Sequence, residues 1–131
     1  MELYYNDYAT FLKHYYEEPV YKIPVNLAGG TCPNRDGRIS TGGCSFCDDS
    51  GAGFQALPDD LSIPEQIAEN KAFYHRRFKC EHFIVYLQTF SNTYMPLSRF
   101  KRVIDAATAD PAVVGLSVST RPDLVHPAYL E

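Results

Sequence analysis

The order of apolar segments most constrains the fold of this 131-residue chain. Strand-like runs at 20–27, 82–88 and 113–119 alternate with helix-like segments, and each interval between strands is long enough for a crossover helix. This alternation predicts parallel strands in right-handed βαβ units. The third run is apolar apart from small residues, a pattern typical of a strand buried on both faces of a parallel sheet. The sequence therefore indicates an α/β fold.

Three segments have the apolar spacing of amphipathic helices. The first begins near Tyr8. The second opens with Ser62 and Glu65 in the form of a capping box, and we expect it to run to about residue 78. The third covers 97–107 and ends before Pro111. The side chains expected to face the core are Phe11, Leu12, Tyr15, Tyr16, Ile63, Ile67, Tyr74, Phe78, Leu97, Phe100, Val103, Ile104 and Ala107.

A glycine-dense segment after the first strand carries most of the chemistry that the sequence suggests. Cys32, Cys44 and Cys47 are spaced C-x11-C-x2-C, and Phe46 precedes the last of them. Seven of the eight glycines fall between positions 29 and 53. Glycine allows positive φ and lets backbone amides approach a ligand closely. Three thiolates also leave one position of a tetrahedral or cubane metal site without a cysteine.

Two interpretations of these cysteines are a disulfide and a structural zinc site. A disulfide is disfavoured because the chain opens without a basic n-region or an apolar h-region, so we expect a cytoplasmic protein, in which clustered cysteines more often bind metal or take part in catalysis. Structural zinc would need a fourth ligand, although no second C-x2-C pair is present. The candidates for that ligand are His14, His75, Cys80 and His82.

The remaining interpretations are a redox dithiol and an iron–sulfur cluster. A dithiol at 44–47 would be expected to open a helix, whereas acidic residues and glycines follow it. A [4Fe–4S] cluster with three thiolate ligands and one open iron accounts for the number of cysteines, the glycines and Phe46 together. We therefore favour the cluster and keep zinc as the alternative.

The second half of the cysteine pattern resembles the radical S-adenosylmethionine (SAM) enzymes, whose usual signature is C-x3-C-x2-C with an aromatic residue before the last cysteine. The eleven-residue first gap departs from that signature. It suits a smaller branch with an enlarged gap, to which the Elongator catalytic subunit is broadly similar. The chain looks most like the YhcC-like radical SAM proteins, in stretches that follow in the expected order at 21–27, 31–37, 41–47, 88–94 and 119–123.

This resemblance implies that residues 1–131 are the N-terminal portion of one radical SAM domain, a partial (β/α)6 barrel with its first three strands and their flanking helices. Within it, 1–19 would be an N-terminal helix, 20–61 the first strand and cluster loop, and 62–131 two further β/α units, the last one truncated. Three strands cannot close a barrel, so we expect the remainder of the barrel to lie outside this chain.

The resemblance also implies a set of ligand-binding residues. Cys32, Cys44 and Cys47 would hold three irons of the cluster, and SAM would chelate the fourth. The cofactor would further contact Phe46, Gln88, Asn92, Ser119 and Arg121: Phe46 shields the cluster, Gln88 and Asn92 offer amide oxygens to an ammonium, and Arg121 offers its fork to a carboxylate or an anionic substrate. The structural alternatives are a hydrogen-bonded turn at 88–94 and an Arg121–Asp123 turn. No catalytic residue is assigned.

The expected activity is reductive cleavage of SAM to a 5′-deoxyadenosyl radical, with an electron donor of the flavodoxin or ferredoxin type. The resemblance suggests a tRNA substrate, with a wobble uridine as the modified base. The net charge of −4 provides no general attraction to nucleic acid, and no apolar run has transmembrane length. The basic run at 75–79 is explained by the negative end of a helix, with tRNA contact as the alternative. The competing class is a zinc-stabilised binding module without enzymatic activity.

Overall fold

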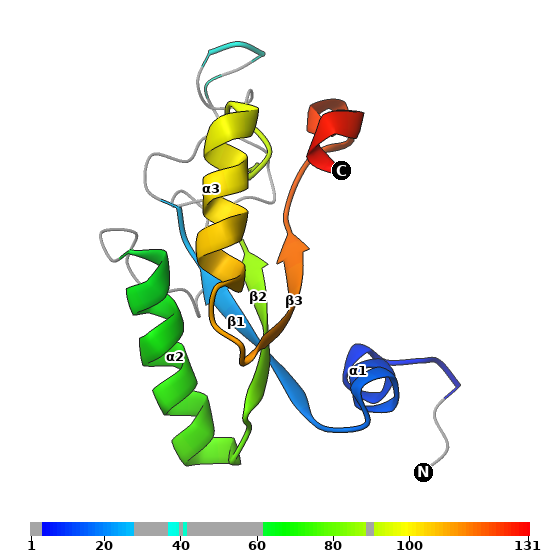
Figure 1. Cartoon of the computed structure of the whole chain (residues 1–131). Coiled ribbons are helices and arrows are strands. Elements are labelled where there is room, and N and C mark those ends of the chain that lie inside the picture. The colour runs from blue at the N-terminus through cyan, green and yellow to red at the C-terminus, as the bar shows by residue number, and fades with distance from the viewer. Residues whose placement is uncertain (1–3, 28–36, 40, 42–61, 89–90) are drawn as a thin grey trace.

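The computed structural model describes residues 4–27, 37–39, 41, 62–88 and 91–131. Along the chain, the elements alternate between helices and strands as expected, and each strand ends one or two residues earlier than the apolar run that predicts it (Figure 1). Two short 3-10 helices follow the last strand. The elements are α1 (Tyr8–Tyr16), β1 (Val20–Val25), α2 (Ile63–Phe78), β2 (His82–Leu87), α3 (Leu97–Thr108), β3 (Val113–Val118), η1 (Pro122–Leu124) and η2 (Pro127–Tyr129).

The three strands form one parallel sheet in the order β1-β2-β3. Val25 pairs with Leu87, and Leu87 pairs with Val118, so all three strands end at one edge, which we call the carboxyl edge. The pairing of β2 with β3 shifts between Phe83 and Ile84. The α/β fold with parallel strands is confirmed; the described residues comprise an open sheet of three strands, and closure into a barrel stays a prediction.

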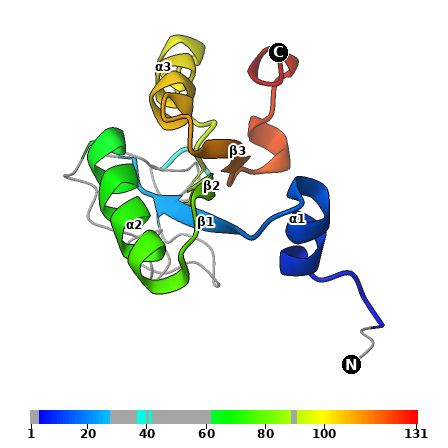
Figure 2. The ribbon, with the colours of Figure 1, turned by 60° about the horizontal axis from the view of Figure 1, so that its bottom comes forward.

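Helices α2 and α3 cover one face of the sheet, whereas α1 lies against the other (Figure 2). The main core fills the space between the sheet and the two crossover helices. Its buried side chains alternate along the strands, because successive residues of a strand point to opposite faces. They are Ile23, Val25, Leu27, Ile67, Cys80, Phe83, Val85, Leu87, Val103 and Ala107.

A smaller cluster joins α1 to the opposite face of the sheet. Leu12 packs with Val20 and Ile84, and Tyr16 is partly buried against them. The Tyr16 hydroxyl donates to the Val114 carbonyl at 3.4 Å. Gly115 makes room for this contact, since a Cβ at that position would lie 3.0 Å from the Tyr16 hydroxyl oxygen.

Three expectations about burial are wrong. Phe78, expected to face the core at the end of α2, is 43% exposed, although its ring stacks on Tyr21. Phe11 and Tyr15, expected in the core, are 45% and 68% exposed, because α1 contacts the sheet only through the stripe that carries Leu12 and Tyr16. β3 is half-buried at all six positions; it is one of the two outer strands of the described sheet, and α1 reaches it through Tyr16 beside Val114. No helix among the described residues is long and apolar enough to span a membrane.

Candidate functional site

Asn92 joins the ends of two strands at the carboxyl edge. Its side-chain amide donates to the carbonyls of Leu87 at 2.8 Å and of Ser119 at 3.0 Å, and its backbone N–H also donates to Ser119 at 3.0 Å. The residue is only 2% exposed, and its Oδ1 atom is buried without a hydrogen-bond partner. The Asn92 side chain therefore holds the ends of β2 and β3 together through its Nδ2 atom, and its Oδ1 atom remains available as an acceptor.

The backbone hydrogen bonds between the strands continue for one more residue, at Gln88 after β2 and at Ser119 after β3. The Gln88 N–H donates to the Val25 carbonyl at 3.3 Å, and the Ser119 N–H donates to Leu87 at 2.9 Å. Gln88, Asn92 and Ser119, which the sequence singles out, therefore lie together at the carboxyl edge. The hydrogen-bonded turn that we considered as the structural alternative is also present, since the Tyr94 N–H donates to Ser91 at 3.0 Å.

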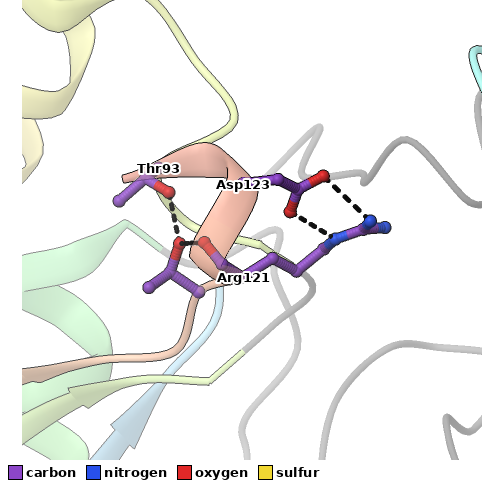
Figure 3. Close-up of polar contacts among 4 residues, drawn as sticks. Thr93, Arg121 and Asp123 are labelled. Atoms are coloured by element: carbon purple, nitrogen blue, oxygen red, sulfur yellow. Dashed lines mark hydrogen bonds and ion pairs between the residues drawn. The ribbon is translucent and has the colours of Figure 1, made fainter. Parts of the chain in front are cut away.

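Arg121 follows β3 and forms a two-pronged ion pair with Asp123 (Figure 3). Its Nε donates to Oδ1 at 2.9 Å and its Nη2 to Oδ2 at 3.0 Å. The Arg121–Asp123 turn expected as the structural alternative therefore forms. The third nitrogen, Nη1, is buried without a hydrogen-bond partner, so one donor group of the guanidinium remains available to a ligand.

The segments after β2 and β3 are also joined through two threonines. The hydroxyl groups of Thr93 and Thr120 form a hydrogen bond, and Thr120 Oγ1 donates to the Arg121 carbonyl at 3.4 Å (Figure 3). With the Asn92 contacts, these bonds hold the two polar loops against each other. The relative position of Asn92 and Arg121 is therefore set by the backbone ends of β2 and β3.

Gln66 is a positioning residue that the sequence analysis missed. It is fully buried in α2, and its side chain accepts from the Asn26 N–H at 2.9 Å and donates to the Asn26 carbonyl at 2.8 Å. These bonds hold the chain just after β1, where the cysteine-bearing segment begins. A glutamine one position before Ile67, on the predicted inward stripe, was the available signal, but its partner lies 40 residues away in sequence.

Cys32, Cys44, Cys47 and Phe46 lie outside the described residues. A short described piece of the segment between the first two cysteines reaches the carboxyl edge, since the Arg38 guanidinium carbon lies 6.0 Å from the centre of the Tyr94 ring. Next to it, Gly37 has φ of +91°, a conformation that side chains with a Cβ rarely adopt. This described piece therefore lies beside Tyr94, in the segment between β2 and α3.

An open cavity of about 520 Å³ lies beside these loops, between the segment before α3 and the two 3-10 helices. Its walls include Thr93, Met95 and Asp123. The Tyr129 hydroxyl donates to the Met95 carbonyl at 2.6 Å and closes one side. The cavity extends from the carboxyl edge toward the start of α3.

The other candidate metal ligands lie apart. Cys80 is buried before β2, at the end of the sheet opposite the carboxyl edge, and its thiol donates to the His82 carbonyl at 3.0 Å. His14 lies on α1 and His75 on α2. Within the described residues, no group of three or more histidine, cysteine, aspartate or glutamate side chains is arranged to hold a metal ion.

The fold and this edge define an α/β protein with a parallel sheet whose polar loops gather at the carboxyl ends of the strands, the place where such sheets bind ligands. Among known proteins, the chain is 34% identical to the Uncharacterized protein YtqA of Bacillus subtilis over 112 residues, which cover 86% of this chain and 34% of the relative. It is 32% identical to Protein YhcC of Escherichia coli K12 over 126 residues, which cover 96% of this chain and 39% of the relative.

These similarities support the expected relationship to YhcC-like proteins. The chain spans only about a third to two fifths of the length of these relatives, and neither name states an activity. No family model matches the chain. No solved structure matches it either.

Proposed function

We propose that this chain is part of a radical SAM enzyme in which Cys32, Cys44 and Cys47 hold a [4Fe–4S] cluster with one open iron. The observation that supports this most directly is the place of the cysteine triplet in the chain. It follows the carboxyl end of β1 in a parallel sheet, and Arg38, between the first two cysteines, contacts Tyr94 after β2. In parallel sheets, ligands bind at this edge.

The residues present suit both expected cofactors. Three thiolates are the ligands that iron–sulfur clusters take in proteins. At the carboxyl edge, Asn92 Oδ1 is a buried acceptor without a partner, and Arg121 Nη1 is a buried donor without one. An acceptor and a donor are what the ammonium and carboxylate of an amino acid need, and SAM carries both. Gln88 and Ser119 would extend this site, and Phe46 would exclude water from the cluster.

Cys32, Cys44 and Cys47 would hold the cluster, which when bound and reduced would supply the electron for reductive cleavage of SAM. The protein's own residues bind, orient and shield. Asn92 and Thr93 hold the ends of β2 and β3 together, and Gln66 fixes the start of the cysteine-bearing segment. We further propose a tRNA substrate with a wobble uridine and a flavodoxin- or ferredoxin-type donor in the cytoplasm; the sequence resemblance alone supports these points.

The test is anaerobic reconstitution with iron and sulfide, ideally on the complete reading frame, followed by metal analysis and absorption spectroscopy. We expect about four irons per chain and an absorption band that changes when SAM is added. Cys44→Ala should lose the cluster and SAM cleavage. Cys80→Ala is the matched control and should keep both, because Cys80 lies at the opposite end of the sheet.

Two results would overturn the proposal. The first is a SAM-cleaving cluster that survives in Cys44→Ala. The second is one zinc per chain and no cluster in a folded sample, which would favour the zinc-stabilised binding module instead.

A further inference from the structure

The two faces of the sheet differ in polarity. Toward α2 and α3, the strands present only apolar or aromatic side chains. On the face toward α1, the residues nearer the carboxyl edge include Lys22, Tyr86 and Ser117. Parallel sheets are normally covered by apolar contacts on both faces. A lysine, a tyrosine and a serine on the second face therefore suggest a surface that contacts a polar ligand.

The strand register brings these three side chains together. Tyr86 pairs with Pro24 in β1 and with Ser117 in β3. The Lys22 ammonium nitrogen lies 4.5 Å from the centre of the Tyr86 ring, although Lys22 itself pairs with Ile84. Since Tyr86 is two residues beyond Ile84, the lysine side chain leans along the strand toward the carboxyl edge.

Helix α1 closes the lower part of the same face. Leu12 and Tyr16 pack on Val20, Ile84 and Val114, at the amino-terminal ends of the strands. Lys22 is exposed, and Tyr86 and Ser117 are half-buried. Among the described elements, α1 thus forms a floor beneath these three residues, and the open side faces the carboxyl edge.

The Lys22 charge has no carboxylate partner in the described part of the chain. The ion pairs found there join Lys71 to Asp110, His82 to Glu18 and Arg121 to Asp123. A cation over a ring is attracted by the ring face, and an ammonium has three donors to direct at other groups. The aromatic contact therefore orients the ammonium and leaves its hydrogen-bonding capacity for a ligand.

We propose that Lys22, with Tyr86 and Ser117, binds an anionic group, a carboxylate or a phosphate, of a small molecule that enters from the carboxyl edge. This site is additional to the proposed cluster, SAM and tRNA contacts, and it rests on the proposed function only in assigning the small molecule to the same enzyme. The binding step itself requires neither the cluster nor SAM.

The test follows the backbone amide signals of Lys22, Tyr86 and Ser117 by NMR in the 15N-labelled chain. Inorganic phosphate and acetate are titrated separately, with chloride at matched ionic strength as the reference. We expect saturating shifts with phosphate or acetate and only small linear shifts with chloride. The anion that saturates at the lower concentration identifies the ligand group as phosphate or carboxylate.

Three variants locate the site. Lys22→Gln should weaken anion binding roughly tenfold or more, because a charged hydrogen bond is lost. Lys22→Arg should keep it, and Lys101→Gln, an exposed lysine of α3, is the matched control that should bind like the wild type. Thermal unfolding checks that all three variants fold.

Wild-type shifts no larger than those caused by chloride, or saturation retained in Lys22→Gln, would overturn the inference. If cluster reconstitution failed while anion binding stayed intact, the proposed function would be refuted and the anion-binding site at Lys22 would still be supported.

Discussion

At the scale of single residues, Arg121 has two candidate roles: it can stabilise the turn after β3, or it can contact a ligand. Its ion pair with Asp123 occupies two nitrogens, while Nη1 remains buried without a partner. If Nη1 binds the SAM carboxylate, Arg121→Gln should weaken SAM binding about tenfold in the reconstituted protein. Asp123→Asn keeps the guanidinium and removes a competing carboxylate, so SAM affinity should not fall. Equilibrium dialysis with labelled SAM measures both.

The control for this experiment is Arg102→Gln, which changes an exposed arginine of α3. Unchanged SAM affinity in Arg121→Gln, together with a lower melting temperature, would mean that the ion pair only shapes the turn after β3. This comparison separates the two interpretations because one variant removes the cation and the other removes its partner.

The sequence predicts which residues reach the carboxyl edge, but it does not predict what they contact. Gln88, Asn92, Ser119 and Arg121 are found there because each follows a parallel strand. That Asn92 bonds carbonyls on two strands depends on a register set by contacts far apart in sequence. Gln66 could not be predicted for the same reason: its partner is the backbone of Asn26, just after β1 and 40 residues away in sequence, which no side-chain pattern reveals.

At the scale of elements, local signals predict helix limits better than helix faces. Ser62 and Glu65 form the expected capping box at the start of α2, because both bonds lie within one turn. In α1, the spacing of apolar residues does not reveal how large an area of the sheet the helix packs against. The helix buries Leu12 and leaves Phe11 and Tyr15 exposed, since it meets only the amino-terminal end of the opposite face.

The contact between α2 and the turn before β3 should depend on pH. The hydrogen bond from Lys71 at 2.6 Å is the main cause that lowers the pKa of Asp110, and the Ala112 N–H adds to it. Because the pKa is lower in the folded state, the stabilisation is complete above the unfolded value of about 4 and is lost as the pH falls through the folded value. Asp110→Asn should therefore reduce the free energy of unfolding near neutral pH and not at about pH 2.

The expected difference near neutral pH is about 0.5–1 kcal/mol, because both side chains are roughly a third exposed (34% and 29%) and water screens the pair. Urea unfolding of wild type and variant at several pH values measures it. A difference that stays constant from neutral to acidic pH would contradict the ionic origin and indicate a change in packing.

At the scale of the whole molecule, the described structure leaves two surfaces that usually attract other polypeptide. The first is the outer strands of the described sheet, β1 and the half-buried β3, and the second is the exposed aromatic surface of α1 and the residues before it. The rings in that surface belong to Tyr4, Tyr5, Tyr8, Phe11 and Tyr15. Open strand edges and exposed apolar patches both promote association. The relatives are about two and a half to three times as long as the matched region, so further polypeptide could cover these surfaces in them.

We therefore expect the 131-residue chain to self-associate as its concentration rises. The double variant Phe11→Lys, Tyr15→Lys should shift it toward the monomer with little change in its melting temperature, because both rings are exposed and their ring contacts within the described residues are with each other and with Tyr16 on the same helix. Phe73→Lys, at a similarly exposed ring of α2, is the matched control and should leave association unchanged. Sedimentation velocity distinguishes the cases. Association that persists in the α1 variant would assign it to an outer strand of the sheet, β1 or β3, since α1 would then contribute no attractive surface.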